Sequence, residues 1–299
     1  MGVLLLERAY AKVNLTLDVL HRRPDGYHEV DMVMQSIDLS DLVWLERHPE
    51  DRIVLESNAT YVPTDDRNLA VQAAKLFLRR TEISAGVHIN LEKNIPVAAG
   101  LAGGSSDAAA TLRGMNRLFG TGLSLDELAE MGAEIGSDVP FCVYGGTAIA
   151  RGRGEQLTRV EHRCHMYVLL IHPRVFVSTA DIYKGLRPGD FTVRPTSERM
   201  VAALVDDDVD VIPALVSNRL QPVTFGIYPE VLQLSEKVEA VTRHPVHMSG
   251  SGPTLFLLAP TIQQANRMYN ALRGIMRDVY FSQFVGNVSS LTSLQPKSE

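Results

Sequence analysis

The chain has 299 residues, a length usually divided between two domains, and its apolar content is sufficient for a sizeable core. Lys and Arg number 29 and Asp and Glu number 35, so the formal net charge of −6 argues against nucleic acid as a partner. No apolar run is long enough for a membrane span, and Glu7 interrupts the start before a signal-peptide core could form. We therefore expect a cytoplasmic protein with no membrane partner.

The first part of the chain has the pattern of a mixed α and β domain. Alternating apolar residues predict strands at residues 9–20, 41–46, 53–56 and 87–91. Helical spacing predicts a helix over residues 68–80 and another that follows the glycine-rich stretch and stops at Gly120. Ser124 and Glu127 have the spacing of a capping box, so a further helix should follow and end at Gly136.

A glycine-bearing turn within residues 145–155 marks the expected boundary between a domain of residues 1–155 and a domain of residues 156–299. Beyond it we expect strands at 166–171 and 255–258, and helices at 197–204, 229–241 and 262–276. The expected fold class is α+β in two domains. Cys142 and Cys164 form no CxxC or metal-ligand pattern, which fits a reducing compartment.

The stretch PVAAGLAGGSSDAAA at residues 96–110 is the strongest chemical signal in the chain. Gly100, Gly103 and Gly104 are expected at the tightest positions, where a β-carbon would keep backbone N–H groups from phosphate oxygens. Ser105 and Ser106 then open a helix, whose N-terminus favours an anion. The alternative is a plain loop before an amphipathic helix. No Gly-Lys dipeptide occurs, so a Walker A loop is excluded.

The pattern P-x-x-x-G-L-x-G-G-S-S resembles the phosphate-binding motif of the GHMP kinases. AYAKVNLTLDVLHRRPDGYHEVD at residues 9–31 resembles the first motif of that family, and HMSGSGPTLFLL at residues 247–258 resembles the third. The resemblance implies a two-domain fold: an N-terminal mixed-sheet half similar to domain 2 of ribosomal protein S5, and a C-terminal ferredoxin-like α/β half. It also implies transfer of the γ-phosphate of ATP to an alcohol of a small molecule.

Within that family, AKVNL, RPDGYHE and GSDVPF are most similar to the kinases of non-mevalonate isoprenoid biosynthesis. The resemblance implies an acceptor that carries cytidine diphosphate, with ATP as co-substrate and Mg²⁺ beside it. Lys12 and Asp138 would be the catalytic pair, with Asp138 either accepting the hydroxyl proton or orienting the hydroxyl. Phosphoryl transfer needs such an oriented nucleophile and charge stabilisation. The alternatives are a surface lysine and a helix cap.

The remaining site residues follow from the same resemblance. The expected ATP-binding residues are Pro96, Val97, Ala98, Ala99, Gly100, Leu101, Ala102, Gly103, Gly104, Ser105, Ser106, Lys93 and Asn68. The expected acceptor-binding residues are Asn14, Tyr27, His28, Tyr183, Ser249 and Gly250.

Tyr27 would stack on the cytosine and His28 would hydrogen-bond it, because a neutral base asks for an aromatic face and a few polar contacts. Phe176 competes with Tyr183 for the opposite face of the base. Ser106 and Glu134 are candidate metal ligands, and neither is assigned.

Two other functions stay open at this point. Another GHMP kinase would act on mevalonate, a sugar or homoserine, which have no base to stack. A nucleotide-binding regulator would keep the fold without catalysis and could lose Lys12 or Asp138, both of which are present. A homodimer is left open.

Overall fold

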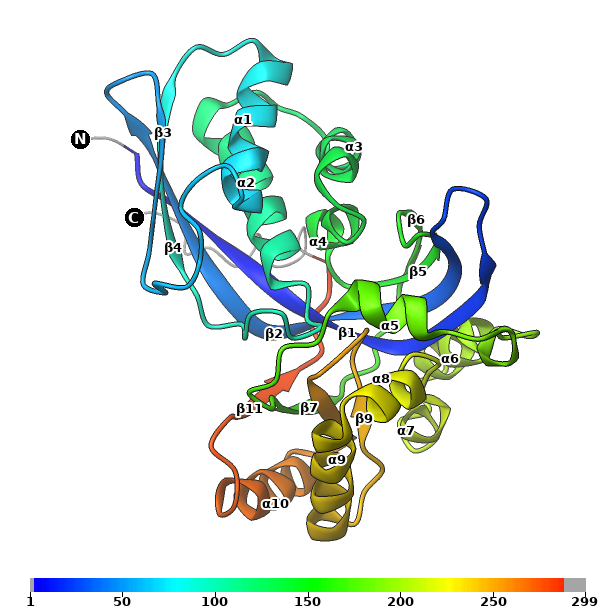
Figure 1. Ribbon diagram of the computed structural model, residues 1–299. Helices are drawn as coiled ribbons and strands as arrows, with labels where there is room; N and C mark the ends of the chain where they lie inside the picture. The colour runs from blue at the N-terminus through cyan, green and yellow to red at the C-terminus, as the bar shows by residue number, and fades with distance from the viewer. Residues whose placement is uncertain (1–2, 288–299) are drawn as a thin grey trace.

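The computed structural model describes residues 3–287 and consists of two halves, each built on its own sheet (Figure 1). The larger sheet belongs mainly to the first half of the chain, and the smaller sheet lies below it in the figure. Seven strands form the larger sheet: β1 (Leu5–Arg22), β2 (His28–His48), β3 (Ile53–Ser57), β4 (Gly86–Glu92), β5 (Thr147–Gly152), β6 (Gln156–Val160) and β8 (Ser217–Asn218). The two-part α+β fold is confirmed.

β1 and β2 are the long central strands of this sheet, and both extend beyond the predicted segments. They pair antiparallel, but the register shifts just before Lys12 and just after Asn14. Bulges of this kind bend a strand and re-aim its side chains, and they are common beside active sites. Since residues two apart point to the same face of a strand, Lys12 and Asn14 lie together between two irregularities.

Four helices lie on one side of the larger sheet (Figure 1): α1 (Leu69–Thr81), α2 (Gly103–Phe119), α3 (Leu125–Ile135) and α4 (Val139–Tyr144). The predicted ends are confirmed: Gly120 terminates α2, Ser124 and Glu127 form the capping box of α3, and Gly136 ends it. α4 was not predicted, because six residues are too few to show a helical period. Asp138, expected just past α3, stands at the N-cap of α4.

The smaller sheet has the strand order β11-β7-β10-β9 and is antiparallel throughout. Its strands are β7 (Tyr167–Ile171), β9 (His247–Met248), β10 (Leu255–Ala259) and β11 (Val279–Gln283), and two longer helices, α9 (Pro229–Thr242) and α10 (Ile262–Arg273), pack against it. This order matches the expected ferredoxin-like plan. α10 ends earlier than the predicted residue 276, because Gly274 provides its C-cap.

Short helices fill the long connection from β7 to β9: α5 (Thr179–Gly185), η1 (Pro188–Asp190), α6 (Ser197–Val205), α7 (Ile212–Leu215) and α8 (Gln221–Ile227). The connection is tied to β1, where buried Asp18 accepts 2.8 Å hydrogen bonds from the Thr192 hydroxyl and from the N–H and hydroxyl of Thr196. β8 also pairs with β1. The boundary expected after residue 155 falls in the turn of the β5–β6 hairpin, so the larger sheet continues past it.

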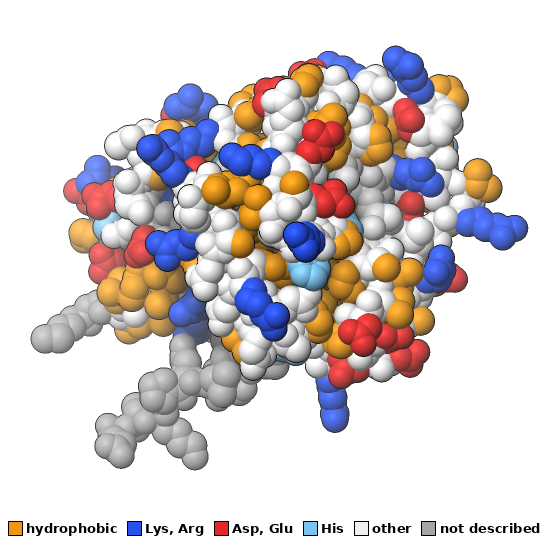
Figure 2. Space-filling view, turned by 90° about the horizontal axis from the view of Figure 1, so that it is seen from below, with side chains coloured by type: hydrophobic (Ala, Val, Ile, Leu, Met, Phe, Trp, Pro, Cys, Tyr) orange, Lys and Arg blue, Asp and Glu red, His pale blue; other side chains and the backbone are white. Residues whose placement is uncertain are grey.

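The surface agrees with the charge balance of the sequence. Figure 2 shows basic and acidic side chains interspersed over the face seen from below, with a group of acidic side chains at one edge. Within residues 3–287, no helix combines the length and the apolar character needed to cross a membrane. Cys142 and Cys164 are both buried free thiols.

Candidate active site

The glycine-rich stretch forms a loop that leads directly into α2. Its backbone enters the left-handed region at Ala98, Gly100 and Ala102, with φ angles of 54°, 73° and 59°. Ala102 is the N-cap of α2 and makes no side-chain cap hydrogen bond. The first N–H groups of α2 therefore lack a side-chain acceptor, and they can bind an anion. Two alanines in a conformation that favours glycine indicate a strained loop, as is common at ligand sites.

Gly100 is the loop position where a β-carbon fits least. A β-carbon there would lie 2.2 Å from the carbonyl oxygen of Ser249. At Gly103 and Gly104 the nearest atoms belong to side chains, at 3.2 and 3.5 Å. The sequence predicted that all three glycines are tight; the structure gives that role to Gly100, because the loop packs there against the third glycine-rich motif.

A cavity of about 340 Å³ opens between the loop and the start of α1. Most of the predicted ATP-binding residues line it: residues 96–100 and 102–105, Lys93 and Asn68. The other two face elsewhere. Leu101 is buried in the core, and the Ser106 hydroxyl is buried and donates a 2.6 Å hydrogen bond to the Tyr10 carbonyl. The hydroxyl of Ser106 is therefore used by the fold.

Lys93 lies in a buried ion group at one side of this cavity. Its Nζ donates to Asp41 and, at 2.7 Å, to Asp107, and all three side chains are almost fully buried. Asp107 also lines the cavity, and its Oδ1 has no hydrogen-bond partner among the described residues. Burial raises the pKa of Asp107, against the opposing effect of Lys93. The ammonium of Lys93 is thus already paired with Asp41 and Asp107 inside the protein, at the wall of the cavity.

The side chain of Asn68 has a structural role in the fold. Its Oδ1 accepts a 2.9 Å hydrogen bond from the N–H of Ala70, which caps α1, and its Nδ2 donates to the Pro63 carbonyl at 2.7 Å. Asn68 borders the cavity, and these two bonds fix the wall that it forms.

Lys12 and Asp138 meet in a second, larger cavity. The distance from Lys12 Nζ to Asp138 Oδ2 is 3.7 Å, and the lysine side chain is 6% exposed against 32% for the aspartate. The lysine is therefore the buried partner, and the carboxylate is open to the cavity. Asn14 Oδ1 accepts a 2.7 Å hydrogen bond from Lys12 Nζ, and the Lys12 backbone N–H donates to the Leu101 carbonyl at 3.1 Å. These bonds fix the ammonium and attach its strand to the phosphate loop.

Ser249 and Gly250, both expected at the acceptor, lie where the third motif meets the loop. Ser249 is fully buried; its hydroxyl donates to the Gly100 carbonyl at 2.9 Å and accepts from the Asn14 N–H at 3.3 Å. Gly250 lines the larger cavity. Of the two, only Gly250 is placed to touch a ligand there, whereas Ser249 joins the two halves of the protein.

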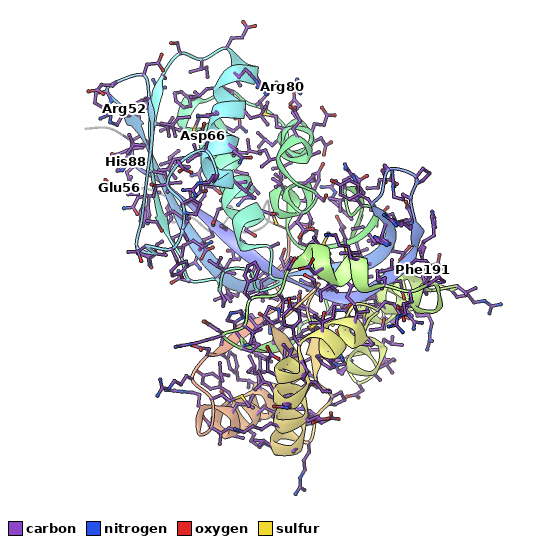
Figure 3. The ribbon with its side chains drawn as sticks, in the orientation of Figure 1. Arg52, Glu56, Asp66, Arg80, His88 and Phe191 are labelled. Carbon is purple, nitrogen blue, oxygen red and sulfur yellow. The ribbon has the colours of Figure 1, made fainter. Side chains whose placement is uncertain are left out.

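The larger cavity has a volume of about 1120 Å³ and extends to an aromatic end beside the β1–β2 turn. Tyr27 lines it and is 57% exposed. The ring of His28 lies 5.2 Å from the ring of Tyr183 and 6.2 Å from that of Phe191, which is labelled on the segment after α5 in Figure 3. Phe176 lines a different cavity. The structure therefore brings Tyr27, His28 and Tyr183 together and leaves Phe176 out.

The electrostatics of the aromatic end suit a neutral base next to an anion. Burial, assisted by the positive charge of Arg22, lowers the pKa of His28, so its imidazole is neutral at pH 7. Arg22, Arg153 and Lys184 line the same cavity. Burial also raises the pKa of Tyr183, which keeps its phenol protonated.

The two candidate metal ligands, Ser106 and Glu134, are already bonded to other protein groups. Glu134 pairs with Arg79 and Arg80, and Figure 3 labels Arg80 on α1, away from the cleft. Among residues 3–287, no group of three or more His, Cys, Asp or Glu side chains could hold a metal ion. A cage built from the protein alone is therefore not seen in the described chain.

The two cavities adjoin, because Gly100, Ala102 and Ser105 line both. A helix start suited to phosphates thus opens toward a Lys–Asp pair, which is the arrangement that phosphoryl transfer to a bound acceptor requires. Residues 68–146 match the family description "GHMP kinases N terminal domain", and residues 200–278 match "GHMP kinases C terminal". The chain belongs to the GHMP kinase family and is an ATP-dependent kinase of a small molecule.

Individual relatives show which members of the family this chain is similar to. The chain is 50% identical over 287 residues to the 4-diphosphocytidyl-2-C-methyl-D-erythritol kinase of Bacillus cereus (strain B4264), covering 96% of this chain and 99% of the relative. The kinase of the same name from Geobacillus sp. (strain WCH70) is 51% identical with the same coverage. A crystal structure of 4-(cytidine 5'-diphospho)-2C-methyl-D-erythritol kinase has a TM-score of 0.81 at 33% identity, covering 94% of this chain and 100% of that one. Homoserine kinase from Cytophaga hutchinsonii shares the fold, with a TM-score of 0.74 at 18% identity and coverage of 96% and 95%.

Sequence reasoning missed several residues of the site. Phe191 and Arg153 lie on connecting segments without a motif, and only their contacts in the fold bring them to the aromatic end. Asp107 is part of the quoted loop stretch and lies about one turn into α2, where a carboxylate competes with a phosphate for the positive end of the helix dipole; that competition was a signal in the sequence.

Proposed function

We propose that the protein phosphorylates the C2 hydroxyl of 4-diphosphocytidyl-2-C-methyl-D-erythritol with ATP, giving the 2-phosphate and ADP, in non-mevalonate isoprenoid biosynthesis. The observation that carries the proposal is the pair Lys12 and Asp138 at the junction of two adjoining cavities. The relatives at 50% and 51% identity are named as this kinase, and the chain aligns with almost their whole length.

The donor side follows from the smaller cavity. The triphosphate of ATP would lie over the loop, where the N–H groups at the start of α2 and its dipole stabilise negative charge. The adenine would then lie toward Asn68 at the start of α1. Because Gly100, Ala102 and Ser105 line both cavities, the γ-phosphate would point toward Lys12 and Asp138.

The acceptor side follows from the larger cavity, with the cytosine at its aromatic end. Tyr27 would offer a face for stacking, and neutral His28 can donate from one ring nitrogen and accept at the other. The basic side chains of Arg22 and Lys184 would favour the diphosphate of the acceptor. Because Lys12 and Asp138 line the same cavity, the methylerythritol end would lie near them.

Lys12 and Asp138 would orient the attacking hydroxyl and balance charge at the transferring group. Asp138 is the more exposed of the two and can accept a hydrogen bond from the hydroxyl, while Lys12, held by Asn14, places positive charge beside the attacking oxygen. Orientation of this kind is a large part of catalysis in phosphoryl transfer.

Mg²⁺ is expected with ATP. The described residues fit a metal held mainly by the triphosphate and water, because Mg²⁺ in kinases keeps few protein ligands and the two cavities are lined by only two described carboxylates, Asp138 in one and Asp107 in the other. When bound, the ion neutralises phosphate charge. The residues of the chain would then hold the phosphates and position the hydroxyl, with Asp138 accepting either its proton or its hydrogen bond.

An ADP-release assay tests the proposal. The protein with Mg²⁺, ATP and the cytidine-bearing acceptor should turn over, whereas mevalonate or homoserine should not replace that acceptor. Asp138→Asn should lower kcat by about 100-fold or more, the usual scale for a lost acid–base group, and change both KM values little. Asp51→Asn is a matched control, since Asp51 is exposed and accepts a hydrogen bond from Ser84. Equal turnover by Asp138→Asn and the parent would remove Asp138 from the mechanism, and faster turnover with mevalonate would overturn the acceptor.

A further inference from the structure

Two turns meet at the aromatic end of the acceptor cavity. The β1–β2 turn carries Tyr27 and the β5–β6 turn carries Arg153, and Figure 1 shows these two hairpins side by side. The guanidinium carbon of Arg153 lies 4.9 Å from the centroid of the Tyr27 ring. A guanidinium over the face of a tyrosine ring is attracted by the negative charge of that face. One face of Tyr27 is therefore covered by a residue of the other turn.

Glu29 joins the two turns through its two carboxylate oxygens. Oε2 accepts a 2.7 Å hydrogen bond from Arg23 Nη1 in the first turn, and Oε1 accepts a 3.0 Å hydrogen bond from the N–H of Gly152 at the start of the second. The Glu29 side chain is 24% exposed, so this bridge is partly shielded from solvent. Hydrogen bonds to a charged carboxylate are stronger than neutral ones.

Each turn is also fixed internally. In the first, the Arg23 N–H donates to the Tyr27 carbonyl at 2.7 Å and the Tyr27 N–H donates to Asp25 at 3.1 Å. In the second, the Arg153 N–H donates to Glu155 at 2.7 Å. β2 and β5 pair antiparallel, and their ladder ends at Val30 and Gly152, so the sheet already fixes the bases of the two turns. The Glu29 bridge adds a contact just beyond that ladder, where the turns leave the sheet.

We propose that Glu29 and Arg153 are positioning residues for the acceptor: Glu29 ties the two turns together beyond the β2–β5 ladder, and Arg153 covers one face of Tyr27 and leaves the other for the base. The inference rests on the proposed function, because it assumes that a base stacks on Tyr27. An exposed aromatic ring on a turn would otherwise sample several orientations, and fixing it in advance lowers the entropy cost of binding.

The test is the separation of acceptor KM from ATP KM in Glu29→Ala, Arg153→Met and Arg153→Lys. Glu29→Ala and Arg153→Met should each raise the acceptor KM about threefold to fivefold, the scale of an exposed cation–π contact, with ATP KM and kcat unchanged. Arg153→Lys keeps a cation and should restore part of the loss. Glu56→Ala is the matched control, since Figure 3 labels Glu56 on β3, across the molecule from Phe191.

A double-mutant cycle with Tyr27→Ala decides whether the two residues act through that ring. If they do, Glu29→Ala and Arg153→Met should each add little to the acceptor KM in the Tyr27→Ala background. Independent effects that simply add, an equal rise in both KM values, or unchanged KM in Glu29→Ala and Arg153→Met would each overturn the inference. Failure of the parent protein to use the cytidine-bearing acceptor would instead overturn the proposed function, so the two failures are distinct.

Discussion

Replacing Gly100 by alanine would test how the phosphate loop is held. The alanine would have to keep a φ angle of 73°, and its β-carbon would lie 2.2 Å from the Ser249 carbonyl oxygen. The left-handed conformation costs an L-residue roughly 1–2 kcal/mol. Because the overlapping atom belongs to the backbone, no side-chain rotation relieves it, and either the loop or the third motif must move.

Gly120→Ala separates conformational strain from overlap. Gly120 has a φ angle of 64°, close to that of Gly100, but a β-carbon there meets no atom within 4 Å. The free energy of unfolding of the Gly120→Ala variant should be lower than that of the parent by about 1–2 kcal/mol. Gly100→Ala should lose a further ~1–3 kcal/mol, the typical cost of overpacking.

Urea unfolding and steady-state kinetics would measure the two variants together. Gly120→Ala should keep the KM for ATP of the parent, whereas Gly100→Ala should raise it about tenfold or more, since a displaced loop loses phosphate contacts. Equal losses of stability in the two variants, with the KM for ATP unchanged in both, would refute the close contact between the loop and Ser249.

Three further outcomes are expected. Asn14→Leu removes the oxygen that accepts the 2.7 Å hydrogen bond from Lys12, so kcat should fall about tenfold with little change in the KM for ATP; an unchanged kcat would contradict this role. Tyr27→Ala should raise the acceptor KM about tenfold, the scale of one stacked base, and a defect mainly in ATP binding would contradict the placement of cytosine. Burial lowers the pKa of His247 to about 4 in the folded protein, whereas in the unfolded chain it is about 6.5. As the pH falls below ~6.5, the unfolded chain binds the proton and the folded protein does not, so the free energy of unfolding decreases. Urea unfolding should show a loss of about 2 kcal/mol from this group between pH 7 and pH 5. His247→Gln should flatten that slope, and equal slopes would exclude His247 as the cause.

Local signals in the sequence predicted much of the fold. The capping box of Ser124 and Glu127 and the stop at Gly120 depend on residues a few positions apart, so they can be recognised without the tertiary structure. The register shifts around Lys12 and Asn14 depend on pairing with β2, and an alternating pattern does not contain them.

The site was predicted in outline through motifs, and its contacts were not. The bond between Ser249 and Gly100 joins residues 149 positions apart, and the stacking of Arg153 on Tyr27 depends on how two hairpins meet. The hydroxyl of Ser106 could serve a ligand or the fold, and only the position of Tyr10 settles that its proton is donated inside the protein.

The contact between Ser249 and the loop has a thermodynamic consequence. No described residue of the C-terminal half lines the smaller cavity, yet that half touches Gly100 through both the hydroxyl and the carbonyl of Ser249. If ATP binds over the loop as proposed and shifts Gly100, its affinity and the local stability around Ser249 would be linked, and each would change the other by the same free energy. A nucleotide contacted only by residues of the first half would then slow hydrogen exchange at Ser249, and a substitution that loosens Ser249 would weaken ATP binding without touching the nucleotide.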